Sequence, residues 1–471
     1  MSQLEAALPA PRTSAYPRRW IAAAVMIVAA LMDMIDATIV NVALPSIRAD
    51  LGASATQVEW IVSAYLLPFA AFLLVAGRLG DLLGRRRLFL GGVVLFGAAS
   101  AVCALAGSPG VLIAARAAEG VAAAMLTPQV LATFREIFDG EERGAAFGMY
   151  GAMAGFAAAI GVIAGGLLTD GLGWRSIFYI NVPVAAVLVP ATLALVPETR
   201  SRAAKRPSLA GTLILLGSLA AIVAPLLEGR RLGWPAWVFA VIALGVAGLF
   251  VLGRTDARRA APLVPTRLFQ VPAFSAGVLV QALFSAGMEG FALCFALWLQ
   301  AGQGYSPTHA GLTLLAFCAG SFLVVAPAVS LAPKVGRVVL SFGGVLMALG
   351  SAGVLYAAHQ ADGPVGTWAL VPGLLVAGAG LGFLVIPLVN VVLSAVGRDE
   401  AGEASGVFGT AQQFGGAVGV AAAGTVFFAH VTGPTLTSAF TAALPLVIGA
   451  YALCALLVLA LPNTAIMDAD V

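Results

Sequence analysis

Two carboxylates stand inside the first long apolar segment, residues 20–44. Asp33 and Asp36 are three residues apart, so both side chains lie on one face of a helix. An ionised carboxylate in a bilayer costs roughly 2.5–3.5 kcal/mol on the insertion scale. Burial and a second acid nearby both favour the protonated form of a carboxyl group. The pair therefore predicts a protein-lined, watery cavity, in which such an acid can load and unload a proton.

A second charged pair stands in the fourth apolar segment. Arg116 and Glu119 are also three residues apart, and Gly120 follows directly. On a helix, Arg116 could set the proton affinity of Glu119 or of an acid in the first segment. The alternative is an ion pair that serves helix packing alone.

A glycine- and arginine-rich motif, G-x-x-x-D-x-x-G-R-R-R, separates the second and third apolar segments. Its glycines, Gly77 and Gly84, permit a tight turn against neighbouring helices. Asp81, followed by Arg85 and Arg86, could pair with an arginine or a helix N-terminus across an interface between helix bundles. Such a latch would hold one conformation and be released in another. The alternative is a basic anchor on one membrane face.

Small residues crowd the fifth apolar segment, where Gly161, Gly165 and Gly166 stand among alanines. Such residues let two helices approach closely, which predicts a packing or hinge helix between bundles. Polar and aromatic residues elsewhere are candidates for the lining of a substrate cavity. They are Asn41, Tyr65, Gln129, Tyr150, Gln281, Asn390 and Gln412.

All of these residues need a membrane-embedded scaffold. The chain has 471 residues, of which 61% are hydrophobic and 10% charged. Soluble domains average about 25% charged residues. The excess of apolar residues excludes a soluble globular fold and predicts an all-α polytopic membrane protein.

Apolar runs of about 20 residues, separated by charged or Pro/Gly-rich breaks, predict fourteen transmembrane helices. They cover residues 20–44, 57–77, 88–107, 110–134, 144–168, 174–196, 209–228, 235–253, 273–300, 307–331, 338–358, 367–394, 404–429 and 440–461.

The basic residues are divided unequally between alternate loops. With the N-terminus inside, most of the 25 lysines and arginines fall in cytoplasmic loops, and Arg116 falls within a segment. The outer loops hold only Arg48, Arg175, Arg230 and Arg231. The positive-inside rule then predicts a multi-pass protein of the plasma membrane with both termini in the cytoplasm.

The chain contains an internal repeat. The pairs that recur at equal spacing are Gly84-Arg85 with Gly336-Arg337 and Gly91-Gly92 with Gly343-Gly344. The repeat predicts two six-helix bundles, residues 1–197 and 271–471, joined by residues 198–270 with two extra transmembrane helices. Parallel repeats of this kind are a transporter architecture, with the substrate site between them near the membrane midplane.

Glu289 is an isolated acid inside the ninth apolar segment. An ionisable residue within the membrane is a candidate functional residue by default. Aligning Gly304 with Gly52 makes Met288 the counterpart of Asp36, so each half places an acid at nearly the same depth. The one-residue difference turns the side chain by about 100°. The alternative is a packed, neutral glutamic acid.

Taken together, the motifs resemble the major facilitator superfamily and, within it, the fourteen-helix drug:proton antiporter family. The likeness covers nearly the whole chain. The stretches that carry it are D-A-T-I-V-N-V-A-L-P at 36–45, the glycine- and arginine-rich motif at 77–87, Arg116 with Gly120, W-R-S-I-F-Y-I-N-V-P at 174–183 and G-Y-S-P at 304–307.

The resemblance implies proton-driven export of small, often amphipathic or cationic compounds. It implies proton or cation handling by Asp36, proton coupling by Arg116 and a conformational latch at Asp81. With Asp36 as the preferred acid, we expect Asp33, one turn closer to the cytoplasm, to tune Asp36 or relay its proton.

Two residues depart from the family pattern. Val162 stands where the antiporters usually have proline, which leaves open a proton-coupled importer or facilitator of a small metabolite. Glu119 stands where glutamine is common, which adds a titratable group.

Other classes of protein fit the sequence poorly. Lys205 and Lys334 lie in no glycine-rich phosphate loop, and the metalloprotease motif H-E-x-x-H is absent, which argues against an ATP-driven pump or a membrane enzyme. We therefore expect no enzymatic activity, cofactor, metal or nucleic acid. The expected partners are a small-molecule substrate, protons and the lipid bilayer around a monomer.

Overall fold

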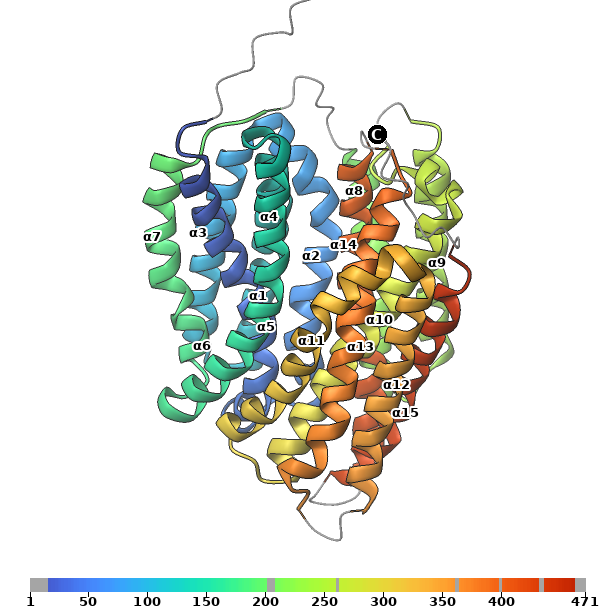
Figure 1. Ribbon diagram of the computed structural model, residues 1–471. Coiled ribbons are helices and arrows are strands. Elements are labelled where there is room, and N and C mark those ends of the chain that lie inside the picture. Colours follow the sequence, from blue (N-terminus) through green and yellow to red (C-terminus); the bar gives the residue numbers. More distant parts are fainter. Residues whose placement is uncertain are drawn as a thin grey trace, which may run out of the picture.

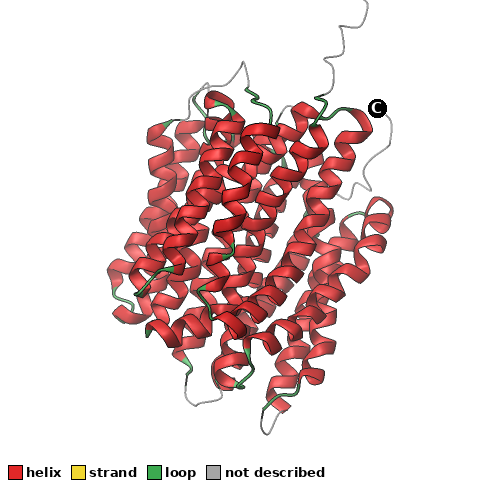
Figure 2. Cartoon of the chain, turned by 90° about the vertical axis from the view of Figure 1, so that its left-hand side faces the viewer, coloured by secondary structure: helices red, strands yellow, loops and turns green. Residues whose placement is uncertain are grey.

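The computed structural model describes residues 16–200, 208–259, 262–360, 364–397, 400–431 and 436–461. In these ranges every regular element is a helix (Figure 2). The first elements are α1 (Arg19–Leu51), α2 (Ala55–Leu83), α3 (Arg85–Ala104), α4 (Pro109–Ile137), α5 (Gly140–Leu172), α6 (Ser176–Tyr179), α7 (Asn181–Leu195), α8 (Leu209–Leu232) and α9 (Ala236–Asp256). The later elements are η1 (Thr266–Gln270), α10 (Pro272–Leu297), η2 (Trp298–Gly302), α11 (Pro307–Val335), α12 (Arg337–Gln360), α13 (Thr367–Ser394), α14 (Ala401–Ala429) and α15 (Thr437–Val458).

Thirteen helical segments within these ranges are long and apolar enough to cross a membrane. The short helix α6 continues into α7 as one such segment, and α10 continues into η2. The helix α14 is a further long helix, made less apolar by Gln412, Gln413 and several glycines. Each of the fourteen predicted segments falls on one of these helices, which confirms the all-α membrane fold.

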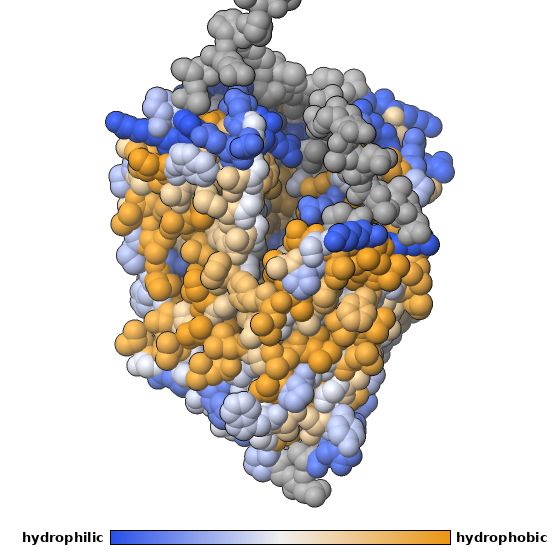
Figure 3. Space-filling model, in the orientation of Figure 1, coloured by the Kyte–Doolittle hydropathy of each residue, from blue (hydrophilic) through white to orange (hydrophobic). Residues whose placement is uncertain are grey.

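Several helices extend beyond the predicted apolar segments. Both α1 and α5 have 33 residues, whereas about 20 residues suffice to cross the hydrocarbon. The first turn of α5 carries Glu141 and Glu142, which favour a helix N-terminus although they lie outside an apolar run. In Figure 3 a broad hydrophobic belt accordingly lies between hydrophilic residues at the two ends of the molecule.

Local capping sets several helix ends. Ser54, Ser108, Ser208 and Ser306 each precede a helix and accept a backbone N–H with the side-chain oxygen. Gly52 ends α1 in the left-handed region, with φ 61°, which lets the chain turn back into α2.

The helices form two sets that meet along a seam. In the first set α4 packs on α2 and α3, and α5 packs on α1. In the second set α13 packs on α11 and α12, and α14 packs on α10. The sets meet where α2 contacts α14, α5 contacts α11 and α1 contacts α10. The inserted helix α8 pairs with α9 and contacts both α2 and α14, so it lies beside the seam between the sets.

The two sets touch at one end and separate at the other. The last turns of α5 and the first turns of α11 lie together at the lower end of Figure 1. At this end the Thr308 N–H donates to Asp170 Oδ2 at 3.0 Å, and Gln300 Nε2 donates to the Val42 carbonyl at 2.7 Å. Toward the upper end α5 and α11 diverge, and the surface between the sets is hollowed (Figures 1 and 3). We call these the closed end and the open end; α1 begins at the open end.

Candidate functional site

The guanidinium of Arg116, on α4, lies between two buried carboxyl groups. Its Nη1 is 2.5 Å from Asp36 Oδ2, on α1, and 2.7 Å from Glu119 Oε2, one turn along α4. Both carboxyl groups are fully buried, and Arg116 is 2% exposed. The guanidinium also stacks over the Tyr65 ring, 4.3 Å from its centroid. The structure therefore brings together three of the predicted residues around one cation, which we call the Arg116 cluster (Asp36, Arg116 and Glu119).

Two polar residues that the sequence reasoning missed complete this cluster. Asn181, at the start of α7, donates to Asp36 Oδ1 at 3.0 Å and to Ser100 Oγ, on α3, at 3.2 Å. Ser100 Oγ in turn donates to Glu119 Oε1 at 2.5 Å. The hydrogen bonds form a closed ring through four helices. Asn181 lies inside the 174–183 stretch that resembles a known family, and that likeness was the available signal.

Close helix packing holds the ring in place. A Cβ atom at Gly120 would overlap the Tyr65 carbonyl oxygen, so the glycine lets α4 lie directly against α2. Arg116 Nε uses this proximity to donate to the Ile61 carbonyl at 3.4 Å. These contacts hold the guanidinium between the two acids in this conformation.

The charges in the ring limit what it can do. One guanidinium faces Asp36 and Glu119, and a buried carboxylate without a cation is strongly disfavoured. The ring is neutral when one of the two acids carries a proton. Both acids bond to the same Nη1 atom. The arrangement is suited to binding and releasing a single proton.

Asp33 lies one turn nearer the open end than Asp36. It is 5% exposed and accepts a hydrogen bond from the Tyr65 hydroxyl. Tyr65 was expected to line a substrate cavity; its ring instead stacks on Arg116 while its hydroxyl binds Asp33. It therefore connects the second acid of α1 to the Arg116 cluster.

Replacing Tyr65 with phenylalanine is expected to lower the stability of the purified protein by about 1–3 kcal/mol, because Asp33 loses its donor in a buried place. The melting temperature in detergent, read by intrinsic fluorescence, measures this. Tyr356→Phe is the matched control, since Tyr356 is 66% exposed. Equal melting temperatures for the two variants would show that the Tyr65 hydroxyl contributes nothing.

Glu289 reaches across to the first set of helices. Its Oε2 accepts a hydrogen bond from Asn41 Nδ2, on α1, at 3.5 Å. The alignment of the two halves placed Glu289 at nearly the depth of Asp36. Asn41 is five residues beyond Asp36, so the contact of Glu289 with α1 lies more than one helical turn closer to the closed end. Glu289 is thus separate from the Arg116 cluster, and its contact joins α10 to α1.

The remaining cavity candidates lie in different surroundings, and Tyr150 lies near one of these acids. Gln129 Nε2 donates to the Ala76 carbonyl at 3.0 Å, and Gln281 donates to Ser285 at 3.3 Å, so both are engaged in helix packing. The positions of the others differ. Tyr150 is half-buried on α5 within electrostatic range of Asp33, whereas Asn390 and Gln412 are exposed.

The three glycines of α5 mark its close contacts. A Cβ at Gly161 would overlap Thr38 Oγ1, and one at Gly165 would stand 3.0 Å from Ile39 Cγ1, so α5 packs tightly on α1. A Cβ at Gly166 would stand 2.7 Å from the Thr308 Cα, on α11. These glycines therefore allow α5 to contact both sets of helices near the closed end.

The glycine- and arginine-rich loop differs from expectation in one contact. Asp81 Oδ1 accepts from Arg85 Nη2 at 2.8 Å, within the same loop, rather than pairing across the interface in this conformation. Arg85 begins α3 four residues after Asp81, so its side chain reaches back over the turn. Gly84, with φ 109°, leaves room for Glu198, whose Oε1 accepts the Arg86 N–H at 3.2 Å.

An ion pair that was not predicted joins the two sets beside this loop. Arg78, next to Gly77 on α2, has Nη2 3.7 Å from Glu403 Oε1, on α14. Gly77 itself packs near Pro128, on α4. At the open end the loop is therefore bound within its own set, while Arg78 makes the contact to the other.

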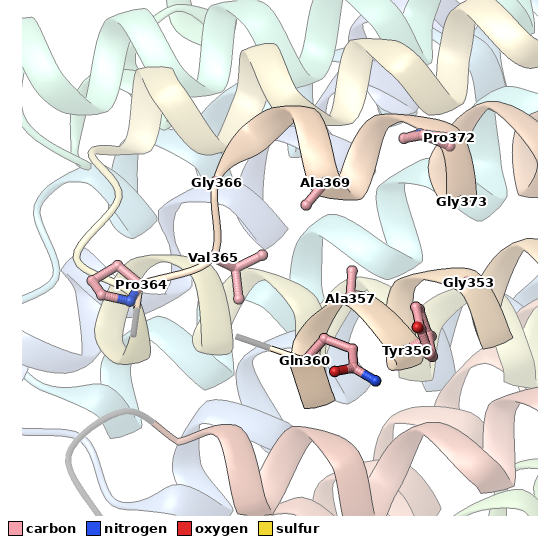
Figure 4. Close-up of a pocket in the computed structure, with 10 residues that line it drawn as sticks. All are labelled: Gly353, Tyr356, Ala357, Gln360, Pro364, Val365, Gly366, Ala369, Pro372 and Gly373. Atoms are coloured by element: carbon pink, nitrogen blue, oxygen red, sulfur yellow. The ribbon is translucent and has the colours of Figure 1, made fainter. Parts of the chain in front are cut away.

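A separate cavity of about 450 Å³ lies between the ends of α12 and α13 (Figure 4). Small residues line much of it, with Tyr356 and Gln360 beside them. None of its lining residues is a predicted site residue or contacts the Arg116 cluster. It is therefore a different feature from the site built on α1 and α4.

Comparisons with known proteins agree with this architecture. The model of the Major Facilitator Superfamily matches residues 26–420. The chain is 40% identical over 424 residues to a probable actinorhodin transporter of Streptomyces coelicolor, covering 88% of this chain and 73% of that protein. It is 38% identical to a puromycin resistance protein of Streptomyces alboniger, covering 87% and 82%. It is 33% identical to a cephamycin export protein of Amycolatopsis lactamdurans, covering 90% and 88%.

Solved structures share the fold at low sequence identity. A peptide transporter in complex with sulfate matches with a TM-score of 0.69 and 15% identity, covering 93% of this chain and 94% of that one. A nucleoside transporter matches with a TM-score of 0.65 and 14% identity, covering 94% and 99%. With the family match over most of its length, this chain is a multi-span membrane transporter that belongs to the major facilitator superfamily.

Proposed function

We propose that this transporter exports small antibiotic-type compounds from a bacterial cell in exchange for protons. Relatives that cover most of the chain are named for actinorhodin transport, puromycin resistance and cephamycin export. The observation that carries the proton part is the position of Arg116 between the buried Asp36 and Glu119. One cation shared by two acids is a site that is neutral with one proton and negative without it.

The orientation follows from the basic residues. Arg19, Arg78 and Arg85 lie at the open end, whereas Arg48 and Arg175 lie at the closed end. The positive-inside rule then assigns the open end to the cytoplasm. Both termini are cytoplasmic in this orientation, and the structure corresponds to the inward-facing conformation of a plasma-membrane protein.

The proposed cycle uses the proton to change the balance of charge around Arg116. A proton on Asp36 leaves Arg116 paired with Glu119, and loss of the proton leaves two anions facing one cation. Asp33 and Tyr65 extend from the cluster toward the open end, and we assign them the exchange of that proton with the cytoplasmic cleft. A cationic or polar substrate would favour the deprotonated state, which couples the two movements.

The two bodies that move are residues 1–197 and 271–471, with residues 198–270 beside them. Alternating access in such repeats is largely a rocking of one bundle against the other. The hydrogen bond between Asn41 and Glu289 would couple movement of the second bundle to α1. The glycines of α5 would act as the hinge between the two bundles. Asp81 would form its latch in the conformation in which the open end closes.

The test is proton movement in everted membrane vesicles with an acidified lumen. Adding puromycin or a cephamycin is expected to release protons from the lumen only when the transporter is present. Compound uptake into the same vesicles should follow the pH gradient and stop when an ionophore removes it. Uptake that continues without proton release would contradict antiport and would favour a facilitator.

A further inference from the structure

A second buried acid stands at the closed end, away from the Arg116 cluster. Glu59, in the second turn of α2, is fully buried, and neither carboxylate oxygen has a hydrogen-bond partner in the described part of the chain. The sequence reasoning did not single it out, because it lies next to the polar turn where the second apolar segment begins. A buried carboxylate without donors is strongly disfavoured.

The covering of Glu59 comes from the opposite set of helices. A Cβ atom at Gly424, on α14, would stand 2.5 Å from Glu59 Oε1, so the α14 backbone lies directly over the carboxyl group. The inserted helix α8 closes the next side, where the Thr425 hydroxyl donates to the Leu226 carbonyl at 3.4 Å. Glu59 is thus sealed inside the seam between α2 and α14.

The charged groups around Glu59 are already engaged or make no bond to it. Glu228, on α8, accepts from Trp60 Nε1 at 3.0 Å and from Arg231 Nε at 2.7 Å. Arg230, on α8, lies with its guanidinium 5.4 Å from the centroid of the Phe428 ring, and its buried Nε has no hydrogen-bond partner.

No side chain on the other described helices around Glu59 makes a hydrogen bond to it. The titratable neighbour on α10 is the buried thiol of Cys294. On α1, Arg48 faces the ring of Phe428, with 5.4 Å between the guanidinium and the centroid. The part of α14 that covers Glu59 presents Gly424 and Phe428, which carry no charge. In this conformation Arg230 is the nearby positive charge, but no group of the described residues donates a hydrogen bond to either carboxyl oxygen of Glu59.

Alternating access would change these surroundings. When the two sets separate at the closed end, α14 moves off α2 and Glu59 meets water, with Arg230 nearby. The carboxylate is then solvated. Closing α14 over either form of the carboxyl group removes its water and provides no hydrogen-bond partner. Only closure over the carboxylate also buries a charge, which costs far more than burying the neutral group.

We propose that closure of this end requires a proton on Glu59. The proton comes from water at the closed end, binds the Glu59 carboxylate before α14 covers it, and returns to the same side when that end reopens. Glu59 is thus a positioning residue that makes closure depend on the pH at this face and does not carry the transported proton. Only the identity of this face as the outside rests on the proposed function.

Closure of this end can be measured directly as the distance between the two sets of helices at the closed end. Cysteines replace Leu105 and Trp368, which are exposed at this end in opposite sets, in full-length protein whose four native cysteines are changed to alanine. Spin labels on this pair are read by double electron–electron resonance in lipid nanodiscs from mildly acidic to alkaline pH. We expect the long-distance population to grow as the pH rises. In Glu59→Gln that growth is lost and the short distance persists at every pH.

Three further variants make the result specific. Glu59→Asp keeps a carboxyl group and should keep the pH dependence, and Glu141→Gln, at the exposed start of α5, should behave as the parent protein. In the Asp36→Asn background the Glu59-dependent change should persist, even if proton antiport through Asp36 proves wrong. An unchanged pH response in Glu59→Gln overturns the proposal. A lowered ratio of protons to substrate in Glu59→Gln vesicles also overturns it, since Glu59 would then carry a transported proton.

Discussion

Replacing Arg116 with methionine is expected to destabilise the purified transporter by about 3–5 kcal/mol, the range for breaking a buried ion pair from one side. The variant leaves Asp36 and Glu119 fully buried with no cation. If both acids bind a proton, the buried charge is removed. The hydrogen bonds from the guanidinium to both acids and to the Ile61 carbonyl are still lost. Chemical unfolding in detergent and the yield of monodisperse protein measure the loss.

A triple variant separates charge from packing. Combining Arg116→Met with Asp36→Asn and Glu119→Gln removes all three charges and is expected to recover most of the stability while remaining inactive in transport. Arg175→Met is the matched control, because Arg175 pairs with Asp50 at an exposed site, where an ion pair is worth about 0–1 kcal/mol. If Arg116→Met were no less stable than Arg175→Met, the cluster would not be the buried charge centre that its geometry indicates.

Replacing Asp36 with asparagine is expected to abolish uphill transport while preserving the fold. Arg116 and Glu119 remain as a neutral pair at 2.7 Å, so no buried charge is left unbalanced. Because the Arg116–Glu119 pair carries no net charge, it does not favour binding of a further proton. One proton crossing about 100 mV is worth about 2.3 kcal/mol, roughly a fiftyfold gradient of a neutral compound. The ratio of compound concentration inside the energised vesicles to that outside should therefore fall from roughly fifty to about one.

The same geometry predicts that Glu119→Gln also loses uphill transport, as Asp36→Asn does, because it leaves Arg116 paired with Asp36 alone. Asp139→Asn is the control, since Asp139 is an exposed acid near the start of α5 whose side chain pairs with Arg143. Substrate movement down its own gradient should survive in both cluster variants. Continued uphill accumulation by either of them would remove Asp36 and Glu119 from the coupling mechanism.

The fold could be predicted largely from the sequence, and the reason is local. A helix in a bilayer satisfies its backbone hydrogen bonds within itself, so an apolar run of sufficient length identifies it without knowledge of its neighbours. The ends were less predictable. The start of α5 at Gly140, for example, lies outside the apolar run, where Glu141 and Glu142 in the first turn favour a helix N-terminus.

The candidate site could be predicted in part, because charges within apolar segments are rare. Asp36, Arg116 and Glu119 stood out for that reason, and they meet. Ser100 and Asn181 did not stand out, because uncharged polar residues are frequent in such helices and reveal their role only through their partners. Tyr65 and Gln129 were assigned to a cavity from residue type alone, and both instead bond to groups of neighbouring helices.

The sequence by itself determined that this chain crosses the membrane many times in two related halves, and it identified most of the charged residues, though not Glu59, that would be costly to place there. Only the tertiary structure decided their partners. One residue of difference turns a side chain by about 100° around its helix, so whether an acid faces a cation, a glycine backbone or another half depends on how the helices pack. That packing leaves Asp36 and Glu119 sharing Arg116, brings Glu289 to Asn41, and encloses Glu59 under α14 with no partner.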